Sequence, residues 1–214
     1  MDHYIPIMLK AKGLLCVIVG GGPVAQRKTE YMLSVGASIK LISPAVTEPL
    51  HQAAQNGSLI WHKREYLTGD LAGADLVYAA TDLPAINELV AEEARQLHIP
   101  VNVSGPGQGG NFISPAVVRR GGLLIAVSTS GAGPAAALSI SKELGDRYGG
   151  EYEVYIDFLS RIRDIVKREV SSVRRRHELL RAAAELNILD DIRGGSFQMW
   201  NEQQIKDWIR SYGT

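Results

Sequence analysis

The sequence lacks the features of a membrane, secreted or nucleic-acid-binding protein. Its 214 residues include one cysteine, Cys16, so no disulfide can form within the chain. No segment approaches about 18 uncharged apolar residues, and no basic stretch precedes an apolar run at the N-terminus. The 23 Lys and Arg balance the 23 Asp and Glu, and neither residues 1–150 nor 151–214 carries a basic excess. We therefore expect a cytoplasmic protein with no membrane or nucleic-acid partner.

Metal ligands are also scarce. The 5 histidines are scattered without an i,i+4 pair or a cysteine partner, which predicts no metal site. The chain is 45% hydrophobic and long enough for one large domain, or a domain with an appendage, around a substantial core.

Short apolar runs alternate with amphipathic stretches through the first half. Strand-like runs cover 14–19, 38–42, 59–61, 75–80 and 100–103, and helical patterns cover 23–35 and about 84–96. Short strands that alternate with helices are typical of a doubly wound, mostly parallel α/β sheet of the Rossmann type.

The second half of the sequence has a different pattern. A glycine-rich loop at 104–110 indicates a site or a hinge, and it precedes one clear strand at 123–127 and a helix at about 135–147. Beyond Gly149 and Gly150 the pattern is almost entirely helical, with Gly194 and Gly195 as the only clear break. Within this half, residues 161–176 carry a local excess of arginine and lysine. This excess fits either a polyanionic small molecule or, as the more common case, a solvated helix face.

The strongest local motif follows the first strand. Gly20, Gly22 and Ala25 fit G-x-G-x-x-A between a predicted strand and a predicted helix. Gly20 permits the tight turn, Gly22 lets a pyrophosphate approach the backbone, and Ala25 allows close helix packing. A plain tight turn is the alternative, but three successive glycines make it the less favoured one.

The predicted ends of two further strands add candidates. The second strand ends in Ser43 and Pro44 rather than in an acid or an arginine, so the choice between NAD and NADP stays open. Thr81 and Asp82 follow the strand that contains Tyr78, where such a sheet binds its ligand, although they could equally cap the next helix.

Several motifs in order resemble one family. They are Pro6-Ile7, the segment Val19 to Lys28, Ala79 to Asp82 with Asn87, Val101 to Val103, Phe112 to Ala116 and Ala126 to Pro134. Together they resemble the precorrin-2 dehydrogenases of sirohaem biosynthesis, including the N-terminal part of sirohaem synthases, over residues 1 to about 150.

The resemblance implies oxidation of precorrin-2 to sirohydrochlorin by NAD, and some relatives also insert ferrous iron. It implies a dinucleotide-binding domain at 1–113, a dimerisation segment at 114–150 in a homodimer, and a helical domain at 151–214. Cofactor contacts of the family fall on Pro23, Val24, Pro44 and Ala45, which join Gly20, Gly22, Thr81 and Asp82 as candidate cofactor-binding residues.

The same resemblance suggests substrate-binding residues and exposes one departure. The candidates for substrate binding are Asn102, Ser104, Asn111, Ser128, Thr129 and Ser130, although the last three could simply cap a helix. Gly105 stands where relatives carry the aspartate credited with both activities. Asp82 is then the remaining candidate base. Because metal insertion needs a base more than hydride transfer does, we expect dehydrogenation without efficient iron insertion.

Two other functions remain open. A bifunctional dehydrogenase and ferrochelatase would keep both activities, and a nucleotide-sensing module would bind NAD without turnover. The motifs at 112–116 and 128–134 favour the enzyme, since a sensor would not need them.

Overall fold

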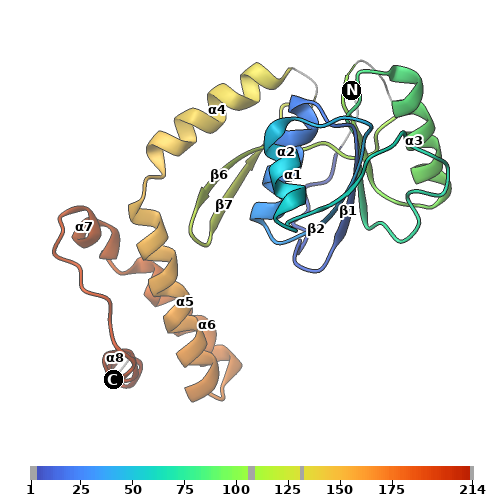
Figure 1. Cartoon of the computed structure of the whole chain (residues 1–214). Coiled ribbons are helices and arrows are strands. Elements are labelled where there is room, and N and C mark those ends of the chain that lie inside the picture. Colours follow the sequence, from blue (N-terminus) through green and yellow to red (C-terminus); the bar gives the residue numbers. More distant parts are fainter. Residues whose placement is uncertain (1–3, 106–108, 131–132, 213–214) are drawn as a thin grey trace. The chain divides into compact units, whose positions relative to one another are not determined.

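The computed structural model describes residues 4–105, 109–130 and 133–212. They fall into two compact units, which meet in the sequence between Ser114 and Pro115 (Figure 1). Each unit has its own sheet.

The first unit is built on a five-stranded parallel sheet with strand order β3-β2-β1-β4-β5. Its elements are β1 (Leu15–Val19), α1 (Pro23–Ser34), β2 (Ser38–Ile42), α2 (Glu48–Gln55), β3 (Ile60–His62), β4 (Leu76–Ala79), α3 (Pro84–Gln96) and β5 (Val101–Val103). This arrangement confirms the predicted Rossmann-type fold.

Helices cover both faces of this sheet, which explains its continuous apolar strands. Successive side chains of β1 point to opposite faces, so Val17 joins a core with Val90 of α3, while Ile18 joins a second core with Met32 of α1. Both strand residues are fully buried. Figure 1 shows α1 and α2 on one face and α3 on the other.

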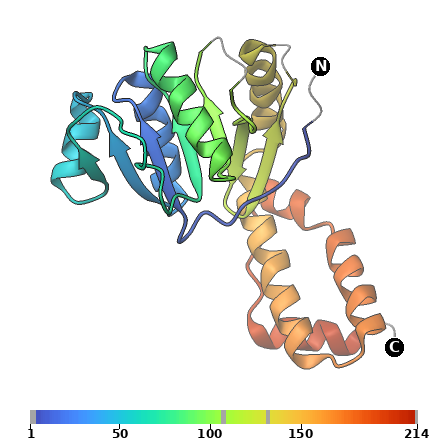
Figure 2. The ribbon, with the colours of Figure 1, turned by 90° about the vertical axis from the view of Figure 1, so that its right-hand side faces the viewer.

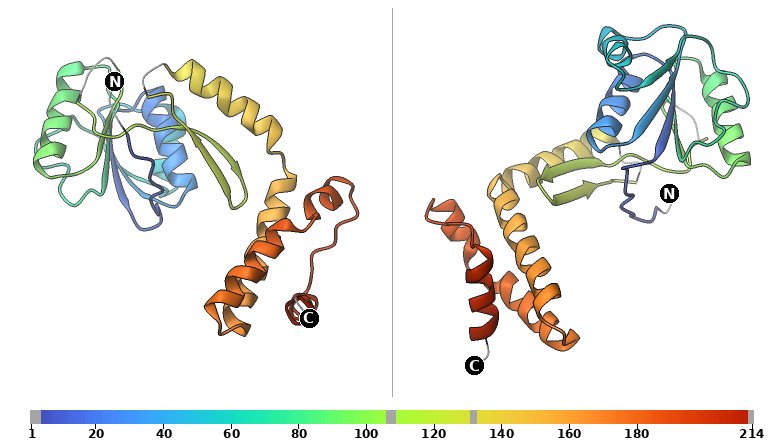
Figure 3. Two further views of the ribbon diagram at one scale, coloured as in Figure 1. Left: turned by 180° about the vertical axis from the view of Figure 1, so that it is seen from behind. Right: turned by 60° about the horizontal axis from the view of Figure 1, so that its bottom comes forward.

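The second unit begins with an antiparallel hairpin, β6 (Ala116–Arg120) and β7 (Leu123–Val127), against which α4 (Pro134–Arg147) packs (Figure 3). Helices α5 (Glu151–Glu169), α6 (Val173–Glu185), α7 (Ile188–Arg193) and α8 (Glu202–Ser211) follow (Figure 2). Their core contains Phe158, Ile162, Leu179 and Ile205, each at most 1% exposed.

Three local predictions were incomplete. The segment before residue 123 was expected to contain no clear strand, but β6 pairs with β7 through the turn at Gly121 and Gly122. Helix α2 was not predicted: it is only 8 residues long and buries Leu50 alone. The helical part also breaks before α6, where Ser172 caps the new helix by accepting from the Arg175 N–H.

Candidate functional site

The turn after β1 depends on Gly20 as predicted. Its φ is +121°, and an added Cβ would lie 2.3 Å from the carbonyl oxygen of Ala80. The Gly20 N–H donates to the Ile42 oxygen at 2.9 Å. Gly20 therefore joins the ends of β2 and β4 at the edge where parallel sheets bind ligands.

Gly21 was not assigned a role from the sequence, yet it makes the tightest contact of the turn. A Cβ on Gly21 would lie 1.9 Å from the Ala45 oxygen, and the Gly21 carbonyl accepts from Thr47 N–H at 3.0 Å. The turns after β1 and β2 are thereby locked together. Only the fold could reveal this pair, because no local pattern links Gly21 to Ala45.

Gly22 is free of such contacts. It is the exposed N-cap residue of α1, and nothing lies within 4 Å of the position of its Cβ. Pro23 occupies the first turn, and no side chain caps the helix. The first N–H groups of a helix have no partner within it, so this open end suits a pyrophosphate. Gly20, Gly22, Pro23 and Val24 therefore fit the dinucleotide predicted to bind there.

The end of β2 borders a hollow of about 300 Å³. Pro44 and Ala45 line it together with His51, Trp61 and Lys63. The Ser43 hydroxyl donates to the Ala45 oxygen at 2.6 Å, and the Trp61 indole donates to the Ser43 oxygen at 2.9 Å. These bonds shape the loop that carries Pro44 and Ala45 beside the glycine turn.

The ends of β4 and β5 are joined by Asn87, which is 5% exposed. Its Oδ1 accepts from the Thr81 N–H and hydroxyl, while its Nδ2 donates to the carbonyl oxygens of Thr81 and Ser104. Helix α3 instead has Leu83 as its N-cap residue, without a side-chain bond, so neither Thr81 nor Asp82 caps it. Asp82 is exposed. The sequence motif contained Asn87, but its bridging role required the fold.

Two of the predicted substrate-binding side chains also support the backbone. Asn102 Nδ2 donates to the Phe112 oxygen at 3.0 Å, and Asn111 Oδ1 accepts from the Val101 N–H at 2.8 Å. They hold the chain that follows the glycine-rich loop against β5. Residues 106–108 of that loop lie outside the described residues.

Gly105 has a φ of +106° with open space around it. An aspartate would fit sterically here, but its backbone would be strained.

The loop at Ser128, Thr129 and Ser130 lies in the second unit, before α4. The Thr129 hydroxyl donates to the Gly133 oxygen at 3.2 Å, and Ser130 has a φ of +47°. Gly133 is the N-cap residue of α4, and no side chain caps it, so the capping alternative is wrong for all three residues.

Several arginines of residues 161–176 pair with acids of neighbouring turns and helices. Arg161 pairs with Asp157 at 3.0 Å, Arg168 with Glu202 at 2.6 Å and Arg174 with Glu178 at 3.0 Å. All of these side chains are more than 40% exposed. These arginines therefore lie on a solvated, ion-paired surface.

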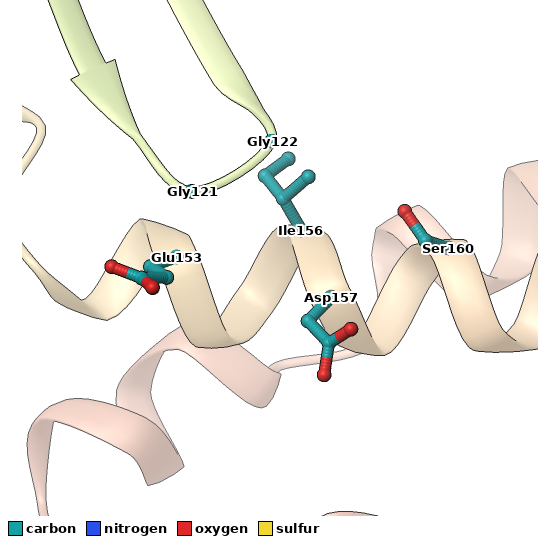
Figure 4. Close-up of a pocket in the computed structure, with 6 residues that line it drawn as sticks. All are labelled: Gly121, Gly122, Glu153, Ile156, Asp157 and Ser160. Carbon is teal, nitrogen blue, oxygen red and sulfur yellow. The ribbon is translucent and has the colours of Figure 1, made fainter. Parts of the chain in front are cut away.

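The second unit contains a shallow hollow of about 260 Å³ between the hairpin turn and α5. Figure 4 shows Gly121 and Gly122 above α5, where Glu153 and Asp157 border the space. None of the predicted site residues lies there. Within the described ranges, no group of three or more His, Cys, Asp or Glu could hold a metal ion. None of the described helices is long and apolar enough to cross a membrane.

Comparisons with known proteins agree with this geometry. Residues 7–116 match a family model described as "Putative NAD(P)-binding". A siroheme synthase of Chromobacterium violaceum is 33% identical over 90% of this chain and 41% of its own length. One of Photorhabdus laumondii is 32% identical over 94% of this chain and 43% of its own length. This chain thus spans about two fifths of these relatives.

A solved structure covers the whole chain. The protein named "SirC, precorrin-2 dehydrogenase" matches with a TM-score of 0.75 and 28% identity, over 98% of this chain and 100% of that one. Since the family model covers more than half of the sequence, the chain belongs to this NAD(P)-binding family, and the predicted relationship to precorrin-2 dehydrogenases and siroheme synthases is confirmed.

Proposed function

We propose that this protein oxidises precorrin-2 to sirohydrochlorin with NAD⁺. The observation that carries the proposal is the full-length match to SirC, because it extends through both units rather than the cofactor domain alone. The open end of α1 at Gly22 supports it from the chain's own geometry.

Different residues of the first unit are proposed to bind different parts of NAD⁺. Gly20, Gly22, Pro23 and Val24 would hold the pyrophosphate, with Pro44 and Ala45 beside the adenosine. Bound NAD⁺ supplies the hydride acceptor. Thr81 and Asp82 follow β4, at the same sheet edge, and would contact the nicotinamide half.

The substrate is proposed to bind at the carboxyl ends of β4 and β5. Ser104 follows β5, and the carbonyl of Ser104 is fixed by Asn87 against Thr81. Asn102, Ser104 and Asn111 would therefore orient the macrocycle next to the nicotinamide. In the second unit, Ser128, Thr129 and Ser130 are separately proposed as substrate-binding residues. Catalysis of this kind consists chiefly of holding the reacting carbon at about 3–3.5 Å from the hydride acceptor.

Because Gly105 carries no base, another group must accept the proton that the substrate releases. Hydride loss leaves a cation whose proton becomes acidic as the ring gains conjugation. Water, or Asp82 as the exposed carboxylate after β4, would take that proton.

We also propose a homodimer in the cytoplasm, where nicotinamide nucleotides are available. Support for the dimer comes from the few buried side chains that the hairpin and α4 have among the described residues.

The test is an anaerobic assay of the purified protein with precorrin-2 and NAD⁺, in which the sirohydrochlorin absorption spectrum is followed. A parallel reaction with NADP⁺ measures cofactor preference. Turnover that depends on NAD⁺ supports the proposal. Binding of NAD⁺ without turnover would instead identify a nucleotide-sensing module.

A further inference from the structure

Lys28 on α1 is a half-buried cation without an anionic partner among the described residues. Its Nζ lies 5.1 Å from the centroid of the Tyr78 ring, and it makes no ion pair or hydrogen bond with any other described residue. Burial lowers the pKa of Lys28, and the neighbouring Arg27 lowers it further. Buried charges are normally paired with an opposite charge, so Lys28 lacks the anion that would usually accompany it.

The surroundings of Lys28 are aromatic and reach the surface. Tyr78 is 4% exposed, makes an edge contact with Phe112 at 5.4 Å, and its hydroxyl lies 3.4 Å from the Ser114 hydroxyl. Ile113, between these two residues, is 37% exposed, and Tyr31, one helical turn beyond Lys28, is 42% exposed. The Lys28 ammonium thus lies over a buried aromatic ring, and exposed apolar side chains follow in α1 and after Phe112, an arrangement that suits a ring that carries carboxylates.

The position of Lys28 separates it from the cofactor phosphates. It lies six residues beyond Gly22, about 9 Å along the axis of α1. Its side chain contacts the Tyr78 ring on β4 rather than the open end of the helix. The carboxylate of a substrate is therefore the better match than the pyrophosphate.

We propose that Lys28 binds a carboxylate group of the tetrapyrrole substrate. This inference rests on the proposed function, since it takes precorrin-2 as the polycarboxylate. A charge-assisted hydrogen bond that is partly shielded from water accounts for about a ten- to hundredfold change in affinity.

The test compares Lys28→Met, which removes the charge at similar length, with Lys28→Arg, which keeps it. Arg27→Met is the matched control, because it removes the same charge from the exposed neighbouring position. For each protein, KM is measured for precorrin-2 and for NAD⁺, and Kd is measured for sirohydrochlorin without cofactor. Thermal unfolding verifies the fold, and Lys28→Gln replaces the methionine variant if that variant does not fold.

We expect Lys28→Met to raise the KM for precorrin-2 and the Kd for sirohydrochlorin at least about tenfold, with the KM for NAD⁺ unchanged. For Lys28→Arg, the KM for precorrin-2 and the Kd for sirohydrochlorin should stay within a few-fold of the values for the unmodified protein. For Arg27→Met, both values should equal those of the unmodified protein. An unchanged KM for precorrin-2 would overturn the inference but leave the proposed function intact. A rise in the KM for NAD⁺ alone would also overturn it, since the anion would then be the cofactor's.

The binding measurement separates the inference from the proposed function. If the unmodified protein binds sirohydrochlorin through Lys28 but does not oxidise precorrin-2, the inference holds and the proposed activity fails. If the protein neither binds nor oxidises a tetrapyrrole, both are wrong.

Discussion

At the scale of single residues, the three glycines of the first turn have different physical requirements. Gly20 and Gly21 are needed because backbone atoms of Ala80 and Ala45 occupy the space of a side chain. Gly22 has open space and a φ of −80°, which any residue adopts. The fold therefore does not require a glycine here, and the open space leaves room for the proposed pyrophosphate.

We predict that Gly22→Leu folds but binds NAD⁺ poorly, with the KM for NAD⁺ raised roughly tenfold or more because the side chain fills the approach of the pyrophosphate. The loss of a glycine N-cap should cost at most about 1 kcal/mol of stability. Steady-state kinetics and thermal unfolding measure the two effects.

Gly21→Ala is the matched contrast, because its Cβ would meet the Ala45 oxygen at 1.9 Å. It should lower the free energy of unfolding by at least about 2 kcal/mol. A folded Gly22→Leu protein with an unchanged KM for NAD⁺ would exclude this turn as the pyrophosphate site.

At the scale of elements, carboxylates order the long connection between β3 and β4. Asp70 accepts two hydrogen bonds from Arg64, at 2.6 and 2.7 Å, and one from the Leu67 N–H. Glu93 of α3 accepts from the Gly69 N–H at 3.0 Å and from the Tyr66 hydroxyl. In this connection, buried carboxylates thus accept hydrogen bonds from backbone N–H groups that have no partner in a helix or sheet.

We predict that this connection makes the protein sensitive to acid. The hydrogen bonds from Arg64 lower the pKa of Asp70 to about 2, below the value of about 3.9 in an unfolded chain. The stabilisation is therefore complete above pH about 5 and is lost as the pH falls from there towards 2. Because Arg64 is 40% exposed and partly screened, we expect about 1–2 kcal/mol.

Asp70→Asn should lower the free energy of unfolding at pH 7 and flatten its dependence on pH between 2 and 5. The exposed Asp146→Asn serves as the control and should leave the curve unchanged. Chemical denaturation at a series of pH values measures both, and equal curves for the Asp70 variant and the unmodified protein would contradict the prediction.

The strands built from continuous apolar runs were predictable from sequence, whereas α2 and β6 were not. The run at β1 is apolar throughout because helices cover both of its faces. Strand β6 has only three apolar residues before Arg119 and Arg120, which is too short a run to recognise. The same holds for the site: Gly20 and Gly22 belong to a local motif, but the roles of Gly21 and Asn87 arise from contacts between separate loops.

At the scale of the whole molecule, the hairpin and α4 offer little core of their own. Their buried side chains within the described residues are Val118, Ala137 and Ser141, while Leu138 of α4 is 62% exposed and Ile140 is 44% exposed. A two-stranded hairpin of this kind is marginally stable alone. A second copy of the chain would cover the apolar residues of α4.

We therefore predict a dimer of twice 23.3 kDa in sedimentation at micromolar concentration. Leu138→Glu should shift it towards monomer, because a charge would be buried at the contact. Lys142→Glu, a charge change at an exposed position of the same helix, should not. A fully active monomer would remove the proposal.

We predict that the molecule oxidises precorrin-2 but does not insert iron efficiently. Hydride transfer requires position, but iron insertion also requires the loss of two protons from pyrrole nitrogens. A placed base contributes about 10²–10⁴-fold to such transfers. Since Gly105 carries no carboxylate, the unmodified protein should oxidise precorrin-2 while inserting ferrous iron at close to the spontaneous rate.

Gly105→Asp should restore a base in open space, although the φ of +106° makes the substitution cost about 1–2 kcal/mol of stability. Gly105→Asn imposes the same strain without the charge, so a rise in the oxidation or insertion rate of the aspartate variant over the asparagine variant measures the carboxylate itself. Both rates are followed anaerobically through the spectra of sirohydrochlorin and sirohaem. Rapid iron insertion by the unmodified protein would mean that another group acts as the base, and Asp82, exposed at the end of β4, is the first to replace.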